Sequence, residues 1–153
     1  MAFLHSPILA LLLTKGTRFQ YLAGNLRPMR ISLTHLALAC CGVEVATAVN
    51  LAKAQDLLTF VEPNESPEAH VLLIAGTVTK AIESDLKSTF DALPSPKYAI
   101  AYGVCASTGG PYWDSYAVTP GADQIIHIDR YVPGCPPPPE TLATAILETV
   151  GTK

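Results

Sequence analysis

Charged side chains are scarce in this 153-residue sequence, and its apolar stretches are too short to cross a membrane. Lys, Arg, Asp and Glu make up 15% of the residues, whereas apolar residues make up 49%. This length and composition predict one domain with a substantial core. The early segment SPILALLL gives way to Lys15 and has no clear cleavage site, so it predicts neither a signal peptide nor a membrane span. We therefore expect a cytoplasmic protein.

Carboxylates are missing before Glu44, although residues 1–30 contain four cations. The rest of the chain carries six basic and thirteen acidic residues. We interpret residues 1–30 as a basic apolar leader that faces a membrane surface or a partner, ahead of a domain over residues 31–153. A partly disordered tail is the alternative. No stripe of basic and aromatic residues occurs, so we expect no nucleic-acid partner.

Complete catalytic motifs are also missing. No nucleophilic triad or phosphate-binding loop is found, and GVCASTGG has neither the spacing nor the position of a nucleotide fingerprint. We therefore do not expect this chain alone to be a complete enzyme.

Short apolar runs alternate with helical patterns along the body of the chain. The runs are LTHLALA (33–39), VLLIA (71–75), YAIAY (98–102) and IIHID (125–129). Helical spacing links Val45, Val49 and Ala52, then Ile82, Leu86, Phe90 and Leu93, and finally Leu142, Ile146 and Val150. This alternation predicts an α/β fold in which helices flank a parallel sheet. We interpret Leu57 to His70 as an irregular loop.

The four cysteines all come just after predicted strands. Cys40 and Cys41 are adjacent, which disfavours a disulfide between them because neighbouring Cα atoms lie only about 3.8 Å apart. Cys105 and Cys135 follow two later strands. Since the carboxyl ends of parallel strands share one rim, the four thiols are expected to converge there.

Four converging thiolates predict a zinc ion or an iron–sulfur cluster. Structural zinc sites usually take cysteines separated by two to four residues, so adjacent cysteines fit one ion poorly. Neighbouring irons of a cubane need separate thiolates, and Gly42 with the glycines near the other cysteines would allow close backbone approach. The residues favour the cluster, and zinc or inert buried thiols are the alternatives.

Four motifs in order, CCGVE, AGTVT, YGVCASTGG and DRYVPGCPPPPE, resemble the B subunit of NADH-quinone oxidoreductase, the 20 kDa or PSST subunit of respiratory complex I. The similarity runs from about Ile31 to Val150, and the family is related to nickel-iron hydrogenase small subunits. The resemblance implies a flavodoxin-like parallel sheet and one 4Fe–4S cluster, the terminal one, that passes electrons to quinone. The implied ligands are Cys40, Cys41, Cys105 and Cys135.

The resemblance also implies a place in a larger assembly. The expected partners are a large subunit with the quinone site, a further iron–sulfur subunit and membrane subunits, with peripheral attachment on the cytoplasmic side of the cell membrane. The alternative is the electron-relay subunit of a membrane-bound nickel-iron hydrogenase-like complex. Tandem cysteines favour the quinone branch, because the hydrogenase branch generally spaces this pair as Cys-x-x-Cys. A remnant fold that binds zinc or nothing is a third possibility.

Two acidic residues carry further expectations. Glu44 occupies the acidic position of the family after the tandem cysteines and is a candidate for a proton or quinone path, with stabilisation of a helix N-terminus as the alternative. Where the family commonly reads SPRQ, this chain reads SPEAH. Glu68 then stands near the position of an arginine close to the cluster, which predicts an unusually low reduction potential.

Overall fold

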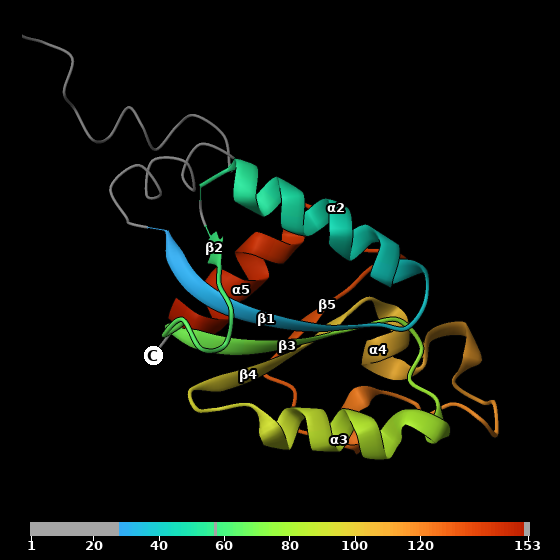
Figure 1. Ribbon diagram of the computed structural model, residues 1–153. Coiled ribbons are helices and arrows are strands. Elements are labelled where there is room, and N and C mark those ends of the chain that lie inside the picture. Colours follow the sequence, from blue (N-terminus) through green and yellow to red (C-terminus); the bar gives the residue numbers. More distant parts are fainter. Residues whose placement is uncertain (1–27, 57, 152–153) are drawn as a thin grey trace, which may run out of the picture.

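A five-stranded, all-parallel sheet runs through the computed structural model, which describes residues 28–56 and 58–151 (Figure 1). The strands are β1 (Met29–Ala37), β2 (Leu58–Phe60), β3 (Ala69–Ala75), β4 (Lys97–Tyr102) and β5 (Arg130–Val132). They lie in the order β2-β1-β3-β4-β5, and every neighbouring pair is parallel. This is the flavodoxin-like order. The predicted α/β fold is confirmed.

Helices cover both faces of the sheet. Helices α2 (Cys40–Ala54) and α5 (Thr141–Gly151) lie on one face, and α3 (Glu83–Ala92) lies on the other (Figure 1). A short helix, α4 (Val104–Thr108), follows β4, and the described residues also contain three 3-10 turns: η2 (Lys80–Ile82), η3 (Gly110–Tyr112) and η4 (Ala122–Gln124). The three longer helices confirm the three helical patterns of the sequence.

Strand β3 shows why the sheet needs both layers. All seven of its residues are buried, as expected for a central strand of a parallel sheet with both faces covered. Val71 and Leu73 join the core under α2 and α5. Leu72 and Ile74 alternate with them and join the core under α3. One continuous apolar run thus serves two cores.

The run IIHID does not form the predicted strand. Ile126 and Ile128 are buried in the core on the α3 side, but pairing with β4 begins only at Arg130, opposite Ile100. Alternating isoleucines bury themselves equally well from a loop, so hydrophobic alternation did not distinguish a buried loop from a paired strand.

The stretch from Leu57 to His70 is also more ordered than predicted. Leu58–Phe60 pairs with the first residues of β1 as an edge strand, and His70 already belongs to β3. Residues 61–68 form a loop, as predicted. Three residues are too few to carry a period-2 signal, which is why the edge strand escaped detection.

The expected leader, residues 1–30, lies outside the described residues except for its last three. Of these, Met29 and Arg30 begin β1, so this strand starts before LTHLALA. Among the described residues, no helix has both the length and the apolar character needed to span a membrane.

Candidate metal centre

The carboxyl ends of four strands form a straight row across the sheet. Ala37 of β1 pairs with Ala75 of β3, Ala75 pairs with Tyr102 of β4, and Tyr102 pairs with Val132 of β5. Three cysteines each come three residues after a member of this row: Cys40, Cys105 and Cys135. The strand register therefore brings the cysteine segments to one rim, as the topology predicted.

Helix α2 begins at the tandem cysteines. Cys40 is exposed, whereas Cys41 is 1% exposed and belongs to the core under α2 and α5. The backbone N–H of Gly42 donates to the carbonyl of Ala39 at 2.8 Å, which forms the first turn. Because neighbouring side chains on a helix point in different directions, one thiol faces the sheet and the other faces outward.

Backbone hydrogen bonds join the segments of the other two cysteines. The N–H of Gly103 donates to the carbonyl of Val132, and the N–H of Val104 donates to the carbonyl of Gly134, both at 2.8 Å. These bonds hold the start of α4 against the segment before Cys135. Cys105 is 5% exposed and Cys135 is exposed. Two thiols are therefore buried at the rim and two are open.

Two glycines leave room for the buried sulfur atoms. A Cβ atom on Gly103 would lie 2.6 Å from Cys41 Sγ, and one on Gly110 would lie 2.9 Å from Cys105 Sγ. Both glycines also have positive φ angles, 95° and 55°, which side chains disfavour. The predicted close approach of glycine backbone to the thiols is present at these two positions.

The four thiols lie within electrostatic reach of one another. The pKa of Cys41 is raised to about 11, first of all by burial and then by its electrostatic interaction and hydrogen bond with Cys40 and by the smaller effects of Cys105 and Cys135. Without a bound cation Cys41 is therefore protonated at neutral pH. A metal that binds here must displace this proton, and its positive charge is what stabilises the thiolate.

Four thiols that follow one row of strand ends are a donor set that an iron–sulfur cluster takes, since a cubane binds one thiolate per iron. Among residues 28–56 and 58–151, no three Cys, His, Asp or Glu side chains are placed so that they could share one metal ion. The chemistry of the donors is therefore what indicates a cluster here.

Glu44 lies on α2 near the buried thiol. It is the fifth residue of the helix and is half-buried, and no acidic residue occurs in the first turn. The alternative explanation, an acid that stabilises the helix N-terminus, is therefore wrong. The charge of Glu44 acts on Tyr102 at the end of β4, which places both residues near the rim.

Tyr102 is a residue of this rim that the sequence did not indicate. It is fully buried, and its hydroxyl donates to the carbonyls of Pro137 at 3.2 Å and Pro138 at 3.4 Å. Burial raises its pKa, and Glu44, Cys41 and Glu140 raise it further while a hydrogen bond with Thr141 lowers it. The hydroxyl therefore stays protonated and available as a donor. A tyrosine immediately before Gly-x-Cys was the available signal.

Glu68 lies at the opposite edge of the sheet. Its backbone N–H donates to the carbonyl of Arg30 at 2.7 Å, and its carboxylate accepts from the N–H of Arg30 at 3.2 Å. Seven residues of β3 then separate Glu68 from the rim, which amounts to roughly 20 Å at the rise of a strand. The prediction that Glu68 lowers the potential of a nearby cluster is wrong. The motif that contains Glu68 aligns with the family in sequence, but the structure puts Glu68 far from the thiols.

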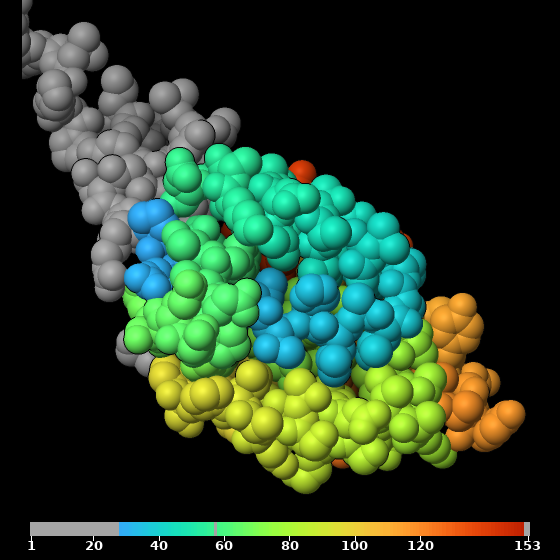
Figure 2. Space-filling view, viewed as in Figure 1, coloured from blue at the N-terminus to red at the C-terminus, as the bar shows by residue number. Residues whose placement is uncertain are grey.

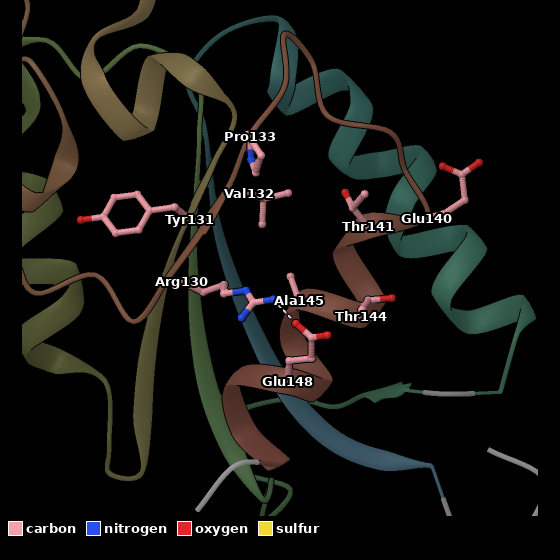
Figure 3. Close-up of a pocket in the computed structure, with 9 residues that line it drawn as sticks. All are labelled: Arg130, Tyr131, Val132, Pro133, Glu140, Thr141, Thr144, Ala145 and Glu148. Atoms are coloured by element: carbon pink, nitrogen blue, oxygen red, sulfur yellow. Dashed lines mark hydrogen bonds and ion pairs between the residues drawn. The ribbon is translucent and has the colours of Figure 1, made fainter. Parts of the chain in front are cut away.

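A groove of about 400 Å³ lies between β5 and α5 (Figure 3). Its lining residues are Arg130, Tyr131, Val132, Pro133, Glu140, Thr141, Thr144, Ala145 and Glu148. An ion pair between Arg130 and Glu148 joins its two walls. No cysteine lines this groove, and it is not part of the candidate metal centre.

Aromatic side chains are exposed beyond the end of α4. Tyr112, Trp113 and Tyr116 are 55%, 65% and 91% exposed, and the orange segment that contains them projects from one end of the molecule (Figure 2). Two backbone bonds of 2.9 Å, from Lys80 N to Ala117 O and from Thr119 N to Val78 O, fix the base of this segment. Exposed aromatic side chains grouped in this way are typical of a surface that contacts another protein.

Comparison with known proteins identifies relatives over most of the chain. The family described as NADH ubiquinone oxidoreductase, 20 Kd subunit, matches residues 32–149. The B 1 subunit of the NADH-quinone oxidoreductase of Salinispora tropica is 43% identical over 74% of this chain and 61% of its own length. The B 2 subunit of the same enzyme from Streptomyces griseus is 44% identical over 74% of this chain and 49% of its own length. The chain thus spans about half to three fifths of these two relatives.

Other relatives belong to different assemblies. The B subunit of the F(420)H(2) dehydrogenase of Methanosarcina mazei is 40% identical over 72% of this chain and 60% of its own length. A chain of the membrane-bound sulfane sulfur reductase, an archaeal respiratory membrane complex, superposes with a TM-score of 0.62 at 26% identity, over 88% of this chain and 71% of that one. A chain of an NAD⁺-reducing nickel-iron hydrogenase (TM-score 0.52, 20% identity, 83% and 94% coverage) shares the fold.

Proposed function

The chain belongs to the family of the NADH ubiquinone oxidoreductase 20 kDa subunit, and from that premise we propose that it is the electron-transfer subunit of a membrane-associated NADH-quinone oxidoreductase. The proposed cofactor is one 4Fe–4S cluster with Cys40, Cys41, Cys105 and Cys135 as ligands. The observation that carries this proposal is the strand register, which puts Cys40, Cys105 and Cys135 each three residues beyond the carboxyl end of its strand, with Cys41 next to Cys40. The proposed cluster domain is residues 31–153, with residues 1–30 as a leader toward a partner or the membrane.

The residues of the chain give the two sides of this site different tasks. Cys41 and Cys105 hold the inner side away from water, and Gly103 and Gly110 keep the space beside their sulfur atoms free. Cys40 and Cys135 present the outer side to a partner subunit. When bound, a cluster of this kind carries one electron at a time between a donor and an acceptor. Burial on one side and exposure on the other suits such a relay.

The proposed acceptor is quinone, bound with a larger subunit, and the proposed neighbours are a further iron–sulfur subunit and membrane subunits. Relatives in NADH-quinone oxidoreductases support NADH as the original donor, and the relative in an F(420)H(2) dehydrogenase supports the same relay with a different donor. The proposed location is peripheral, on the cytoplasmic side of the cell membrane. The half-buried carboxylate of Glu44 is proposed to lie on the path of protons or quinone.

Anaerobic reconstitution of the full chain with iron and sulfide tests the cluster. We expect four irons per chain, as one cubane requires, and an electron paramagnetic resonance signal after reduction. Cys105→Ser removes a buried ligand and is expected to abolish most iron uptake. Thr108→Ala removes an exposed hydroxyl from the same short helix and serves as the matched control. Equal iron in wild type and Cys105→Ser would contradict the proposal.

Capture of the full chain from native membranes, followed by metal analysis, tests the assembly. Iron with a large partner and without nickel is expected for a quinone reductase. Stoichiometric nickel would instead identify the electron relay of a hydrogenase-like complex, which the shared fold with a hydrogenase chain keeps as the second candidate.

A further inference from the structure

The segment that carries Cys135 is held on its amino side by the bond from the N–H of Val104 to the carbonyl of Gly134, but the residues after Cys135 offer no donors of their own. Cys135 is followed by four consecutive prolines, Pro136 to Pro139. Proline has no backbone N–H, so this stretch can be tethered only through its carbonyl oxygens. Donors for these carbonyls must come from other parts of the chain.

Tyr102 supplies the donor for the bonded proline carbonyl that is nearest to Cys135 in sequence, that of Pro137. The hydroxyl oxygen of Tyr102 lies 3.2 Å from the carbonyl oxygen of Pro137 and 3.4 Å from that of Pro138. Pro137 is a buried residue. The carbonyl of Pro138 also accepts from Thr141, and that of Pro139 accepts from the N–H of Leu142, but these donors belong to the start of α5. Tyr102 alone among these donors comes from the sheet.

Tyr102 also stands where the segments of three cysteines meet. It precedes Gly103, and the space beside Gly103 is bounded by Cys41 Sγ, the carbonyl of Gly134 and the ring of Pro137. It comes three residues before Cys105 and pairs with Val132 on β5. A fully buried side chain at the end of a central strand is a rigid base for such a tether.

We propose that Tyr102 is the positioning residue of the Cys135 ligand: its hydroxyl holds the proline segment against β4 so that Cys135 stays in place beside Cys41 and Cys105. This inference rests on the proposed function, because the purpose of the tether is to keep the fourth thiolate on the cluster. Tyr102 touches neither the reacting electron carrier nor quinone in this role. It acts through the backbone of Pro137 and Pro138.

Replacement of Tyr102 by Phe tests this role, because it removes the hydroxyl and keeps the ring. In the reconstituted full chain, Tyr102→Phe is expected to release iron to a chelator about five-fold faster, the factor that corresponds to one lost buried hydrogen bond. Its resonance signal should broaden as the fourth ligand becomes less fixed. In the metal-free full chain, alkylation of Cys135 measured by mass spectrometry should accelerate by a similar factor, while that of Cys105 stays unchanged.

Tyr98→Phe is the matched control, because Tyr98 lies on the same strand and the same core face, four residues before Tyr102. Equal acceleration of iron release in both variants would mean a general loss of stability and would overturn the inference. Wild-type rates and an unchanged signal in Tyr102→Phe would overturn it as well. If the wild-type chain takes up no iron, the proposed function fails, and the alkylation rate of Cys135 in the metal-free variant still decides whether Tyr102 is the tether.

Discussion

At the carboxyl edge of the sheet, the strands end in one row and cysteines follow three residues later. At the amino edge, the same strands begin with polar residues that form hydrogen bonds with backbone groups. Arg30 and Glu68 bond to each other's backbone there, and Lys97 donates from Nζ to the carbonyl of Phe90 at the end of α3. The carboxyl edge instead holds buried thiols beside glycine backbone. The amino edge therefore holds contacts that stabilise the fold, and the carboxyl edge is where the proposed cluster would bind.

The largest expected loss of stability comes from the amino half. Ile31 is fully buried, and its partners on the neighbouring strands are Phe60 and Ala69. Neither partner belongs to a segment that carries a cysteine. Ile31→Ala should lower the free energy of unfolding by about 2–5 kcal/mol, because it leaves a cavity in the core. Chemical denaturation followed by circular dichroism measures this change.

The iron content separates the two edges in the same variant. Folded Ile31→Ala is expected to bind as much iron per chain as wild type, and Thr59→Ala, at an exposed site on β2, is the control for both measurements. Loss of iron from a folded Ile31→Ala variant would show that the amino edge also affects iron binding, which would contradict the separation of the two edges.

The next effect is expected at the carboxyl edge, where stability and chemistry change together. Gly103→Ala would place a Cβ 2.6 Å from Cys41 Sγ at a φ of 95°. Overpacking and the disfavoured φ should cost about 2–4 kcal/mol, and displacement of the sulfur should reduce iron uptake strongly. Gly151→Ala is the control, since nothing lies within 4 Å of that position. A folded Gly103→Ala with full iron would contradict the proposed place of Cys41 in the site.

The sequence predicted the parts of the fold that depend on long patterns. Strand β3 is a continuous apolar run, and the spacing of Leu142, Ile146 and Val150 marks α5, so the α/β class followed directly. The rim was predictable because parallel strands always bring their carboxyl ends together. The strand predicted for IIHID was wrong because its isoleucines are buried although they do not pair with a neighbouring strand.

Interactions between distant segments were beyond the sequence. The bond from Tyr102 to Pro137 spans 35 residues, and no local pattern shows that a tyrosine at the end of a strand meets a proline run. Glu68 was misplaced for the related reason that a match to a motif gives a position in the chain and not a distance to the thiols.

A smaller loss is expected at the start of β5, which is anchored by Asp129. Its carboxylate accepts from the N–H of Ala99 and its own N–H donates to the carbonyl of Ala99, each at 2.9 Å. Asp129→Ala leaves the Ala99 N–H without its partner and should cost about 1–3 kcal/mol in thermal or chemical unfolding. Gln124→Ala, at an exposed residue of η4, is the control. Iron uptake that falls more than stability would assign Asp129 to the metal centre instead.

The smallest effect is the sharpest test of the comparison, because the same chemical change is made at both edges. Glu68→Gln removes a negative charge roughly 20 Å from the rim, and Coulomb repulsion over that distance in water is about 0.2 kcal/mol per unit charge, so the midpoint potential should move by about 10 mV or less. Glu44→Gln removes a half-buried charge on the helix of Cys40 and Cys41. Loss of a nearby negative charge favours the reduced, more negative cluster, and the potential should rise by about 20–40 mV. Equal shifts of the midpoint potential in redox titrations of the two variants would mean that the cluster does not lie beside the thiols. They would also contradict the proposal that only the carboxyl edge binds the cluster.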